Sequence, residues 1–377
     1  MGIAFFQGSM DQARNIIRRV TNVRIVSLGT IFFAILFLLG CFSQRNQKEN
    51  YSRPNSIPNF SDGKSHLIAG KNHACRIAFY NVENLFDTLD GENDDAEFQP
   101  NSDLKWNSDR YKNKLRNIAK VIDSIQPDIL GVVEVENMLA MKDLQTYSSW
   151  INQFVIVHRD SPDKRGIDVA LYYNPSKFAV SGIYVIPISL PDGYATRSIM
   201  RVHLVAMNGK DSLVVFVNHW PSRRSGESSV SNRVIAASIL QENINSNKNF
   251  ARNCIVMGDF NDNPIDSSIA KVLLAGYAND PLVNLALLAK LQGVKGSLAW
   301  FDGWNFFDQI MVSNRIFNHS AKHNKLPELK VYSRDWMLEK GGKYDSWPLR
   351  TYGNKKQYLN GFSDHLPVYV DVFFGRN

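Results

Sequence analysis

Short apolar runs alternate with polar stretches along the chain from residue 76 to its end. Two segments between the runs instead repeat apolar residues every three or four positions, as an amphipathic helix does. These predicted helices are residues 111–125, which end before a proline, and residues 229–244. The runs themselves are rich in β-branched and aromatic residues, which is typical of strands buried in a sheet. The predicted strands are 77–80, 129–133, 169–173, 213–217, 255–257, 310–312 and 368–374.

A chain of 377 residues could form one large α/β domain or two ordinary ones. Neither an internal repeat nor a linker-like break interrupts the pattern after residue 76. We therefore predict a single catalytic domain over residues 74–377. Within it, residues 318–360 lack periodicity, carry two consecutive glycines and many polar residues, and are expected to form a long surface excursion that could lie over the site.

The first 41 residues have the pattern of an export signal. Four arginines between positions 14 and 24 precede an uncharged stretch, residues 25–42. Leu38-Leu39-Gly40-Cys41 resembles the bacterial lipobox, in which the cysteine is lipidated and becomes the mature N-terminus. An uncleaved membrane anchor is the alternative, because eighteen uncharged residues are at the lower limit for spanning a bilayer. Both readings predict an exported, membrane-anchored protein, periplasmic or on the cell surface.

Residues 42–73 are rich in Asn, Ser, Lys and Pro and are expected to form a flexible polar tether. Lys plus Arg exceed Asp plus Glu by 43 to 36, and by 39 to 35 once the first 40 residues are left out. This balance tolerates a polyanionic substrate without requiring one. The three cysteines, Cys41, Cys75 and Cys254, lack the spacing of a zinc site or a disulfide framework, and whether Cys75 and Cys254 pair stays open.

Polar residues capable of chemistry follow several predicted strands. Asn81, Glu134 and His219 each follow an apolar run, and Asp259 and Asn261 follow another. Ligands of open α/β folds usually bind at strand ends, where the loops converge over a rigid scaffold. Each residue alone also has a plain structural reading as a turn, a solvated edge or a hydrogen-bonded histidine. Their joint occurrence in this order favours a site.

Six motifs occur in order along the chain, namely Asn81-Val82-Glu83-Asn84, Glu134, Asn218-His219, Gly258-Asp259-Phe260-Asn261, Asp308-Gln309-Ile310 and Ser363-Asp364-His365. With these motifs, residues 76–377 resemble the endonuclease/exonuclease/phosphatase superfamily. That superfamily includes deoxyribonuclease-I-like nucleases, apurinic endonucleases, sphingomyelinases and inositol-polyphosphate phosphatases. The resemblance implies a four-layer α/β sandwich, in which two mixed β-sheets pack face to face with helices outside.

The resemblance also assigns a metal site. Mg²⁺, with Mn²⁺ as a plausible substitute, would be held by Glu134, and Asp364 and Asn81 would complete or support the site. A hard cation suits this set because it prefers oxygen ligands and keeps several waters for the substrate to replace. Asp259 and Asn261 are two residues apart, so in an extended segment both side chains would face the attacking water and the phosphate.

The histidines are expected to handle protons and the phosphate. His365 would hydrogen-bond the phosphate and act as acid or base, with Asp308 fixing its tautomer and raising its basicity. His219 would contact the phosphate or protonate the leaving oxygen. Asp168 is a candidate to orient His219, and a surface aspartate is its alternative reading.

Arginines and aromatic residues are candidates for substrate binding. Arg197, Arg223 and Arg224, and also Arg350, could bind phosphate through bidentate hydrogen bonds, although a solvated loop explains any one of them. Three aromatic residues before Asp308 could stack on a base or sugar or could pack in the core. They are Trp300, Trp304 and Phe306.

These observations predict a membrane-tethered, monomeric Mg²⁺-dependent phosphodiesterase, an exported endonuclease acting on DNA or RNA. One alternative is a phosphomonoesterase or phospholipase C-like enzyme acting on inositol phosphates or sphingomyelin. A further alternative is a surface-binding protein that lost the chemistry. Against this last one, each expected catalytic position holds the expected residue type.

Overall fold

The computed structural model describes residues 74–373, except 92, 192, 210, 247–252, 277–279, 302 and 324–325. The described residues belong to one compact unit, Ala69–Asn377. The predicted signal segment and tether lie outside them. Within the described part of the chain, no helix combines the length and the apolar character needed to cross a membrane.

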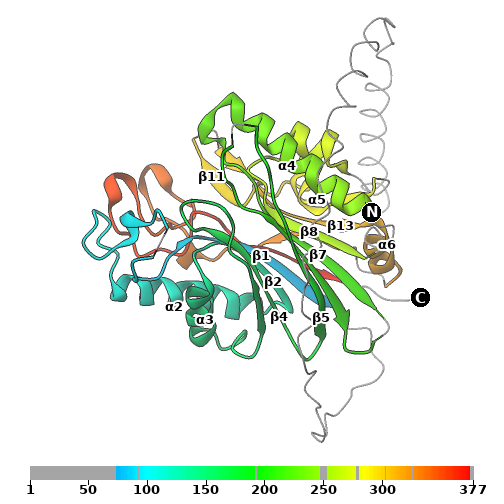
Figure 1. The fold of residues 1–377 in the computed structure, drawn as a ribbon, viewed down its shortest axis with the longest axis horizontal. Coiled ribbons are helices and arrows are strands. Elements are labelled where there is room, and N and C mark those ends of the chain that lie inside the picture. The colour runs from blue at the N-terminus through cyan, green and yellow to red at the C-terminus, as the bar shows by residue number, and fades with distance from the viewer. Residues whose placement is uncertain are drawn as a thin grey trace, which may run out of the picture. The chain divides into compact units, whose positions relative to one another are not determined.

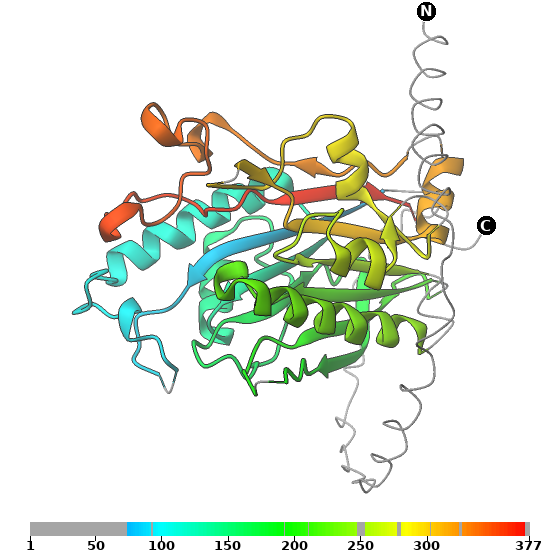
Figure 2. The same cartoon turned by 90° about the horizontal axis from the view of Figure 1, so that it is seen from above.

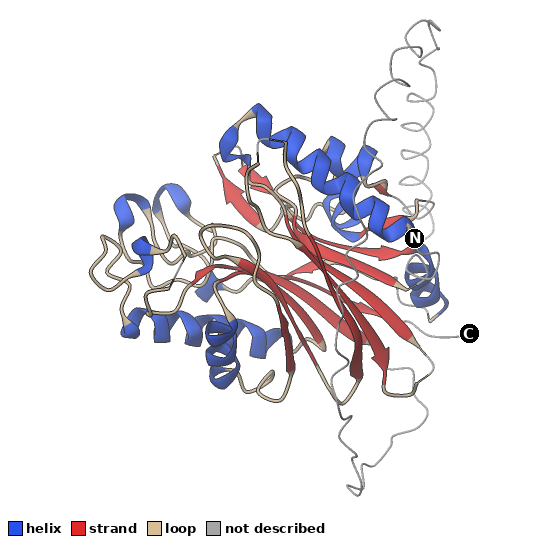
Figure 3. Ribbon diagram, in the orientation of Figure 1, coloured by secondary structure: helices blue, strands red, loops and turns tan. Residues whose placement is uncertain are grey.

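Two mixed β-sheets pack face to face with helices on their outer sides, as Figure 3 shows, which confirms the predicted four-layer sandwich. The six-stranded sheet has the order β14 (Lys330–Val331), β15 (Val368–Val372), β1 (Cys75–Leu85), β2 (Ile129–Val135), β4 (Asp168–Tyr173) and β3 (Val155–His158). The seven-stranded sheet has the order β5 (Phe178–Ile186), β6 (Ile199–Ala206), β7 (Ser212–His219), β8 (Cys254–Asp259), β13 (Asp308–Ser313), β10 (Leu282–Asn284) and β9 (Ala275–Gly276). A separate hairpin joins β11 (Leu298–Trp300) to β12 (Gly303–Asn305).

Strand β1 shows why the apolar runs are continuous rather than alternating. Ile77 and Phe79 point into the layer between the two sheets, whereas Ala78 and Tyr80 point into the layer beneath the helices. Successive side chains of a strand face opposite sides, so a strand covered on both sides needs apolar residues at every position. All seven predicted strands are present with boundaries shifted by a few residues.

Helices cover both outer faces (Figure 1). Helices α2 (Ser108–Ile125) and α3 (Met138–Tyr147) lie on the six-stranded sheet, and α4 (Glu227–Asn245) lies on the seven-stranded sheet. The side chain of Asn107 caps the start of α2 by accepting a hydrogen bond from the N–H of Arg110. Gln126 ends α2 in a left-handed conformation, directly before the proline that cannot continue a helix. Both predicted helices are confirmed, and α3, α5 (Leu285–Leu291) and α6 (Asn314–Lys322) are additional.

The segment 318–360 is more ordered than a surface excursion. It contains the end of α6, strand β14 and three short 3-10 turns, Asp335–Met337, Gly342–Tyr344 and Asn354–Lys356. The buried ammonium of Lys114, on α2, donates to the Thr351 hydroxyl at 2.6 Å and to the Phe362 carbonyl at 2.8 Å. Glu83 accepts from the N–H of Thr351 at 2.7 Å. These bonds hold the segment beside α2, as Figure 2 shows.

The two described cysteines are separate. Cys75 and Cys254 are both buried free thiols, which answers the pairing question that the sequence left open. Burial raises the pKa of both thiols above the ordinary value.

Candidate active site

The strand registers bring three candidate residues side by side in the seven-stranded sheet. Asp259 at the end of β8 is paired with His219 of the parallel strand β7 and with Asp308 of the antiparallel strand β13. The hydrophobic runs determine this arrangement, because each run ends where its strand leaves the buried layer.

In the six-stranded sheet, irregular backbone orients Asn81 and Glu134 toward the candidates of the seven-stranded sheet. The pairing of β1 with β2 shifts register between Asn81 and Leu85, and the pairing of β2 with β4 shifts between Val133 and Val135. Glu134, inside the second shift, has φ of 63°. A left-handed conformation is uncommon for a residue with a side chain, and bulges that re-aim a side chain concentrate at functional sites.

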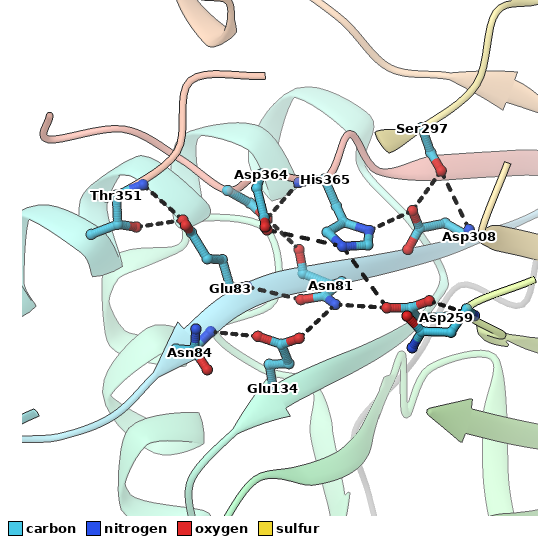
Figure 4. Close-up of polar contacts among 12 residues, drawn as sticks. Asn81, Glu83, Asn84, Glu134, Asp259, Ser297, Asp308, Thr351, Asp364 and His365 are labelled. Carbon is cyan, nitrogen blue, oxygen red and sulfur yellow. Dashed lines mark hydrogen bonds and ion pairs between the residues drawn. The ribbon is translucent and has the colours of Figure 1, made fainter. Parts of the chain in front are cut away.

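Asn81 lies between two carboxylates, as Figure 4 shows. Its Nδ2 donates to Oε1 of Glu134 and to Oδ2 of Asp259, each at 3.0 Å. Its Oδ1 accepts from the N–H of Glu83 at 3.0 Å, which fixes this orientation of the amide. Of the two roles foreseen for Asn81, the geometry fits support of the carboxylates, because the amide presents nitrogen rather than oxygen to the site.

Three groups could hold a metal ion together. One oxygen of Glu134, one oxygen of Asp259 and the Nε2 of His219 all lie within 4.8 Å of one another. Burial, together with the charges of Asp308 and Glu134, raises the pKa of Asp259 to about 6. A divalent cation would relieve this crowding of negative charge, so the donor set fits a metal. Asp364, expected to complete or support the metal site, is not in this group but lines the same cleft, and its metal role stays a prediction.

His365 and Asp308 form the predicted pair. Nδ1 of His365 is 2.7 Å from Oδ2 of Asp308, and the hydroxyl of Ser297 donates to the same oxygen. Burial alone would lower the pKa of His365. The Asp308 carboxylate and its hydrogen bond, with smaller contributions from Asp364 and Asp259, instead raise that pKa well above the ordinary value. Nε2 of His365 therefore carries a proton at neutral pH, and it lies 3.8 Å from Asp259.

The pKa of His219 is shifted in the opposite direction to that of His365. Its Nε2 lies 3.8 Å from Glu134 and 3.8 Å from Asp259, and its Nδ1 has no hydrogen-bond partner among the described residues. Burial, followed by the charges of Arg197 and Arg165, lowers its pKa well below the ordinary value. His219 is therefore neutral at neutral pH, which is the form that ligates a metal.

Two sequence expectations about local partners are wrong. Asp168 does not orient His219: its Oδ2 lies 2.8 Å from Nε2 of His158, and its Oδ1 accepts from the N–H of Ser161. The reason is local, because Asp168 begins β4 and the adjacent strand β3 presents His158 to it. Asn261 is not extended but has φ of 51°, and its N–H donates to Oδ1 of Asp259 at 2.9 Å.

A cleft of about 520 Å³ opens at this cluster. It is lined by Glu134, Asp259, Asp364 and His365, together with His219 and Asn261. Four arginines and the first two turns of α4 also line it. These arginines are Arg165, Arg197, Arg223 and Arg224; none of the described residues 318–360, Arg350 included, lines the cleft.

The arginines do not share one role. Arg223 is engaged by the protein itself: its Nε donates to the Asn261 carbonyl at 2.8 Å, and its Nη2 pairs with Asp266 at 2.6 Å and with Asp262 at 3.1 Å. It therefore holds the Asn261 loop. Arg197 is buried and donates to Asp163 and to the Trp220 carbonyl.

The three aromatic candidates differ in whether they reach the cleft. Trp300 lines the cleft with 42% of its surface exposed, whereas Phe306 is fully buried between the sheets and Trp304 packs on the core beneath the helices. Sequence reasoning missed Arg165 and Ser297. Neither residue belongs to a strand-end motif, so the chain pattern carried no signal for them.

A four-layer sandwich with carboxylates and histidines gathered at the strand ends is the architecture of the deoxyribonuclease-I-like phosphoesterases. The chain matches the endonuclease/exonuclease/phosphatase family over residues 76–373 and belongs to that family. Members of this superfamily hydrolyse phosphate esters and depend on divalent metal ions. No curated protein is similar enough in sequence to match.

Several solved structures share the fold. The catalytic domain of human nocturnin, solved with a bound sulfate anion, is 18% identical with a TM-score of 0.51, and the match covers 80% of this chain and 94% of that one. A mannosyl-6-phosphatase from Bacteroides thetaiotaomicron is 18% identical with a TM-score of 0.51, over 80% and 100% of the two chains. Truncated TDP2 from Caenorhabditis elegans is 14% identical with a TM-score of 0.51, over 80% and 98%. At these identities the likeness shows the fold alone.

Proposed function

We propose that this protein hydrolyses phosphodiester bonds with Mg²⁺, for which Mn²⁺ can substitute. The observation that carries the proposal is the convergence of the Glu134, Asp259 and His219 donors with the His365–Asp308 pair at a single cleft. Hydrolysis of a phosphate ester needs a cation on the phosphate oxygens, a positioned water and a proton for the leaving oxygen. The cluster supplies groups for each requirement.

The cation would be held by Glu134, Asp259 and His219, where it would withdraw charge from the phosphate. Asn81 keeps the two carboxylates in place through its amide hydrogens. Asp259 stands between His219 and His365 and is placed to orient the attacking water. His365, protonated at Nε2, donates a proton to a phosphate oxygen or to the leaving oxygen.

A nucleic acid is the substrate that we propose, as expected from the sequence. The support is the positive charge of Arg165, Arg197 and Arg224 along a cleft that is far larger than one phosphate group. Arg165 and Arg197 share the single carboxylate of Asp163, so a sugar monophosphate bound at the metal site would leave part of this charge uncompensated. Arginine is suited to phosphodiester recognition because its planar fork binds two oxygens at once.

A panel of three substrates tests the function. The purified protein with Mg²⁺ should release acid-soluble nucleotides from DNA or RNA. Release of phosphocholine from sphingomyelin, or of inorganic phosphate from inositol or sugar phosphates, without nucleotide release would instead establish the alternative activities. No release from any substrate by protein that binds Mg²⁺ would favour a binding protein.

Export and membrane anchoring remain proposals supported by residues 1–41, which lie outside the described residues. Cell fractionation of the wild type and a Cys41→Ser variant tests them. The wild type should sediment with membranes, and the variant should lose lipid labelling if Cys41 is the lipidated residue. A variant that still sediments without a lipid label would support the uncleaved anchor. Sedimentation velocity tests the predicted monomer.

A further inference from the structure

The arginine-lined wall of the cleft carries more positive charge than its own carboxylates neutralise. Arg197 and Arg165 share one partner, Asp163, whose two oxygens lie 3.0 Å from Nη1 of Arg197 and 3.5 Å from Nε of Arg165. Arg224 is exposed, lines the cleft and forms no ion pair with any described residue. Arg223, by contrast, is neutralised by Asp262 and Asp266. The excess charge therefore lies with Arg165, Arg197 and Arg224.

A buried hydrogen-bond donor on this wall also lacks a partner. The side chain of Arg197 is 3% exposed, and its Nε has no hydrogen-bond partner within the described part of the chain. A buried N–H without an acceptor costs free energy, and native proteins usually satisfy such groups with water or a ligand. An anion in the cleft would provide the acceptor.

The first turn of α4 completes the wall. Ser228, Ser229 and Asn232 line the cleft, and no side chain caps the helix start at Gly226. The dipole at the start of a helix of 19 residues attracts negative charge. The three arginines and this helix start therefore line the same cleft as Glu134 and Asp259 and add positive charge beside them.

We propose that this wall binds a second phosphate of the substrate, adjacent to the phosphate that is cleaved. The inference rests on the proposed phosphodiesterase function and specifies its substrate. The substrate carries successive phosphodiester groups, as a nucleic acid strand does, and its cleavage at one phosphate depends on the negative charge of the next. The half-exposed Trp300 at the rim is placed to stack on a base between them.

A thymidine trinucleotide with two phosphodiester groups tests this subsite with the full chain and Mg²⁺. Its reference compounds are the two trinucleotides in which one or the other phosphate is a neutral methylphosphonate. The bases are identical, so only the charge of the neighbouring phosphate differs. We compare kcat/KM per cleavable bond between the fully charged trinucleotide and each reference. For the wild type, the value for the fully charged trinucleotide should be about tenfold higher than that of at least one reference. A tenfold difference is the effect expected from the loss of one charge-assisted hydrogen bond.

Arg224→Ala and Arg165→Ala should bring this ratio close to one. Lys164→Ala is the matched control, because Lys164 is an exposed neighbouring cation that does not line the cleft, and it should keep the wild-type ratio. Equal kcat/KM values for all three trinucleotides with the wild type would overturn the subsite. So would a ratio that falls equally in the Lys164 control, because the effect would then be one of net charge.

Equilibrium binding of the same trinucleotides separates failure of the subsite from failure of the proposed function. If the protein cleaves none of them, tighter binding of the charged trinucleotide that is lost in Arg224→Ala still supports the subsite and sets aside the hydrolytic function. Equal affinities for all three trinucleotides overturn the subsite, whether or not the protein cleaves them.

Discussion

Replacing Asp308 with Asn removes the charge that controls His365. The Asp308 side chain is fully buried, and one of its oxygens receives both Nδ1–H of His365 and the Ser297 hydroxyl. A hydrogen bond to a charged group contributes about 1.5–3 kcal/mol. If that contribution stabilises the protonated His365 during the reaction, kcat/KM should fall about 10- to 150-fold.

The pH profile gives a second readout with a defined sign. The carboxylate raises the pKa of His365, so the wild type keeps the imidazolium at neutral pH and loses it only as the pH rises through that raised value. Asp308→Asn lowers the pKa, and the alkaline fall in rate should therefore begin at a lower pH. The assay is kcat/KM for a phosphodiester from pH 5 to 10, with thermal melts at each pH to verify folding.

Ser297→Ala is the matched control for this substitution. It removes a donor to the same oxygen but leaves the charge, so it should lower kcat/KM by roughly fivefold, the effect of about 1 kcal/mol. It should hardly move the alkaline limb. If Asp308→Asn retains wild-type kcat/KM and the wild-type pH profile, the Asp308–His365 pair does not act in the reaction.

Three further predictions concern the scaffold. Lys114→Met removes the buried cation that pairs with the partly buried Glu83 carboxylate, and equilibrium unfolding in urea should show a loss of about 3–5 kcal/mol. A loss under 1 kcal/mol would contradict a role for this contact. Burial raises the pKa of Glu136 from 4.5 to about 7. The contribution of the Glu136 carboxyl to the free energy of unfolding is therefore fully present below pH 4.5 and lost as the pH rises through 7 and the buried carboxyl ionises. Glu136→Gln should therefore be more stable than the wild type at pH 8, by up to about 3 kcal/mol, and not at pH 4; equal urea midpoints at pH 8 would refute this. Arg223→Ala frees the Asn261 loop and should lower kcat about tenfold with little change in KM, whereas a rise in KM alone would show that Arg223 binds substrate instead.

The strand ends could be predicted from the sequence because a buried strand appears there as a continuous run of apolar residues. A run such as residues 255–257 is apolar throughout because both of its faces are covered, and the first polar residues after it, Asp259 and Asn261, must lie at the edge of the sheet. The same logic located His219, whereas Asp308, which begins its strand, was assigned by the family resemblance. The bulge at Glu134 could not be predicted from the sequence, because an extra residue in a strand changes the backbone and not the hydrophobic pattern.

Side-chain partners were predicted less well than positions. Asp168 and Arg223 have the right chemistry for the roles first assigned to them, but neighbours from other strands and loops determined their contacts. A carboxylate pairs with the nearest suitable donor in space, and the sequence gives no distance between β3 and β4. The excess charge of the Arg165–Arg197–Arg224 wall could be recognised only after the acidic partners were located.

Metal-dependent hydrolysis by wild type and Glu134→Gln tests the central claim most directly. Protein stripped with EDTA should not cleave a phosphodiester, and titration with Mg²⁺ should restore the rate. Glu134→Gln, which keeps the shape of the side chain but loses its charge, should need far more Mg²⁺ and reach a rate lower by orders of magnitude. Turnover that survives chelation, or a variant with the wild-type Mg²⁺ dependence, would contradict a catalytic metal held at Glu134.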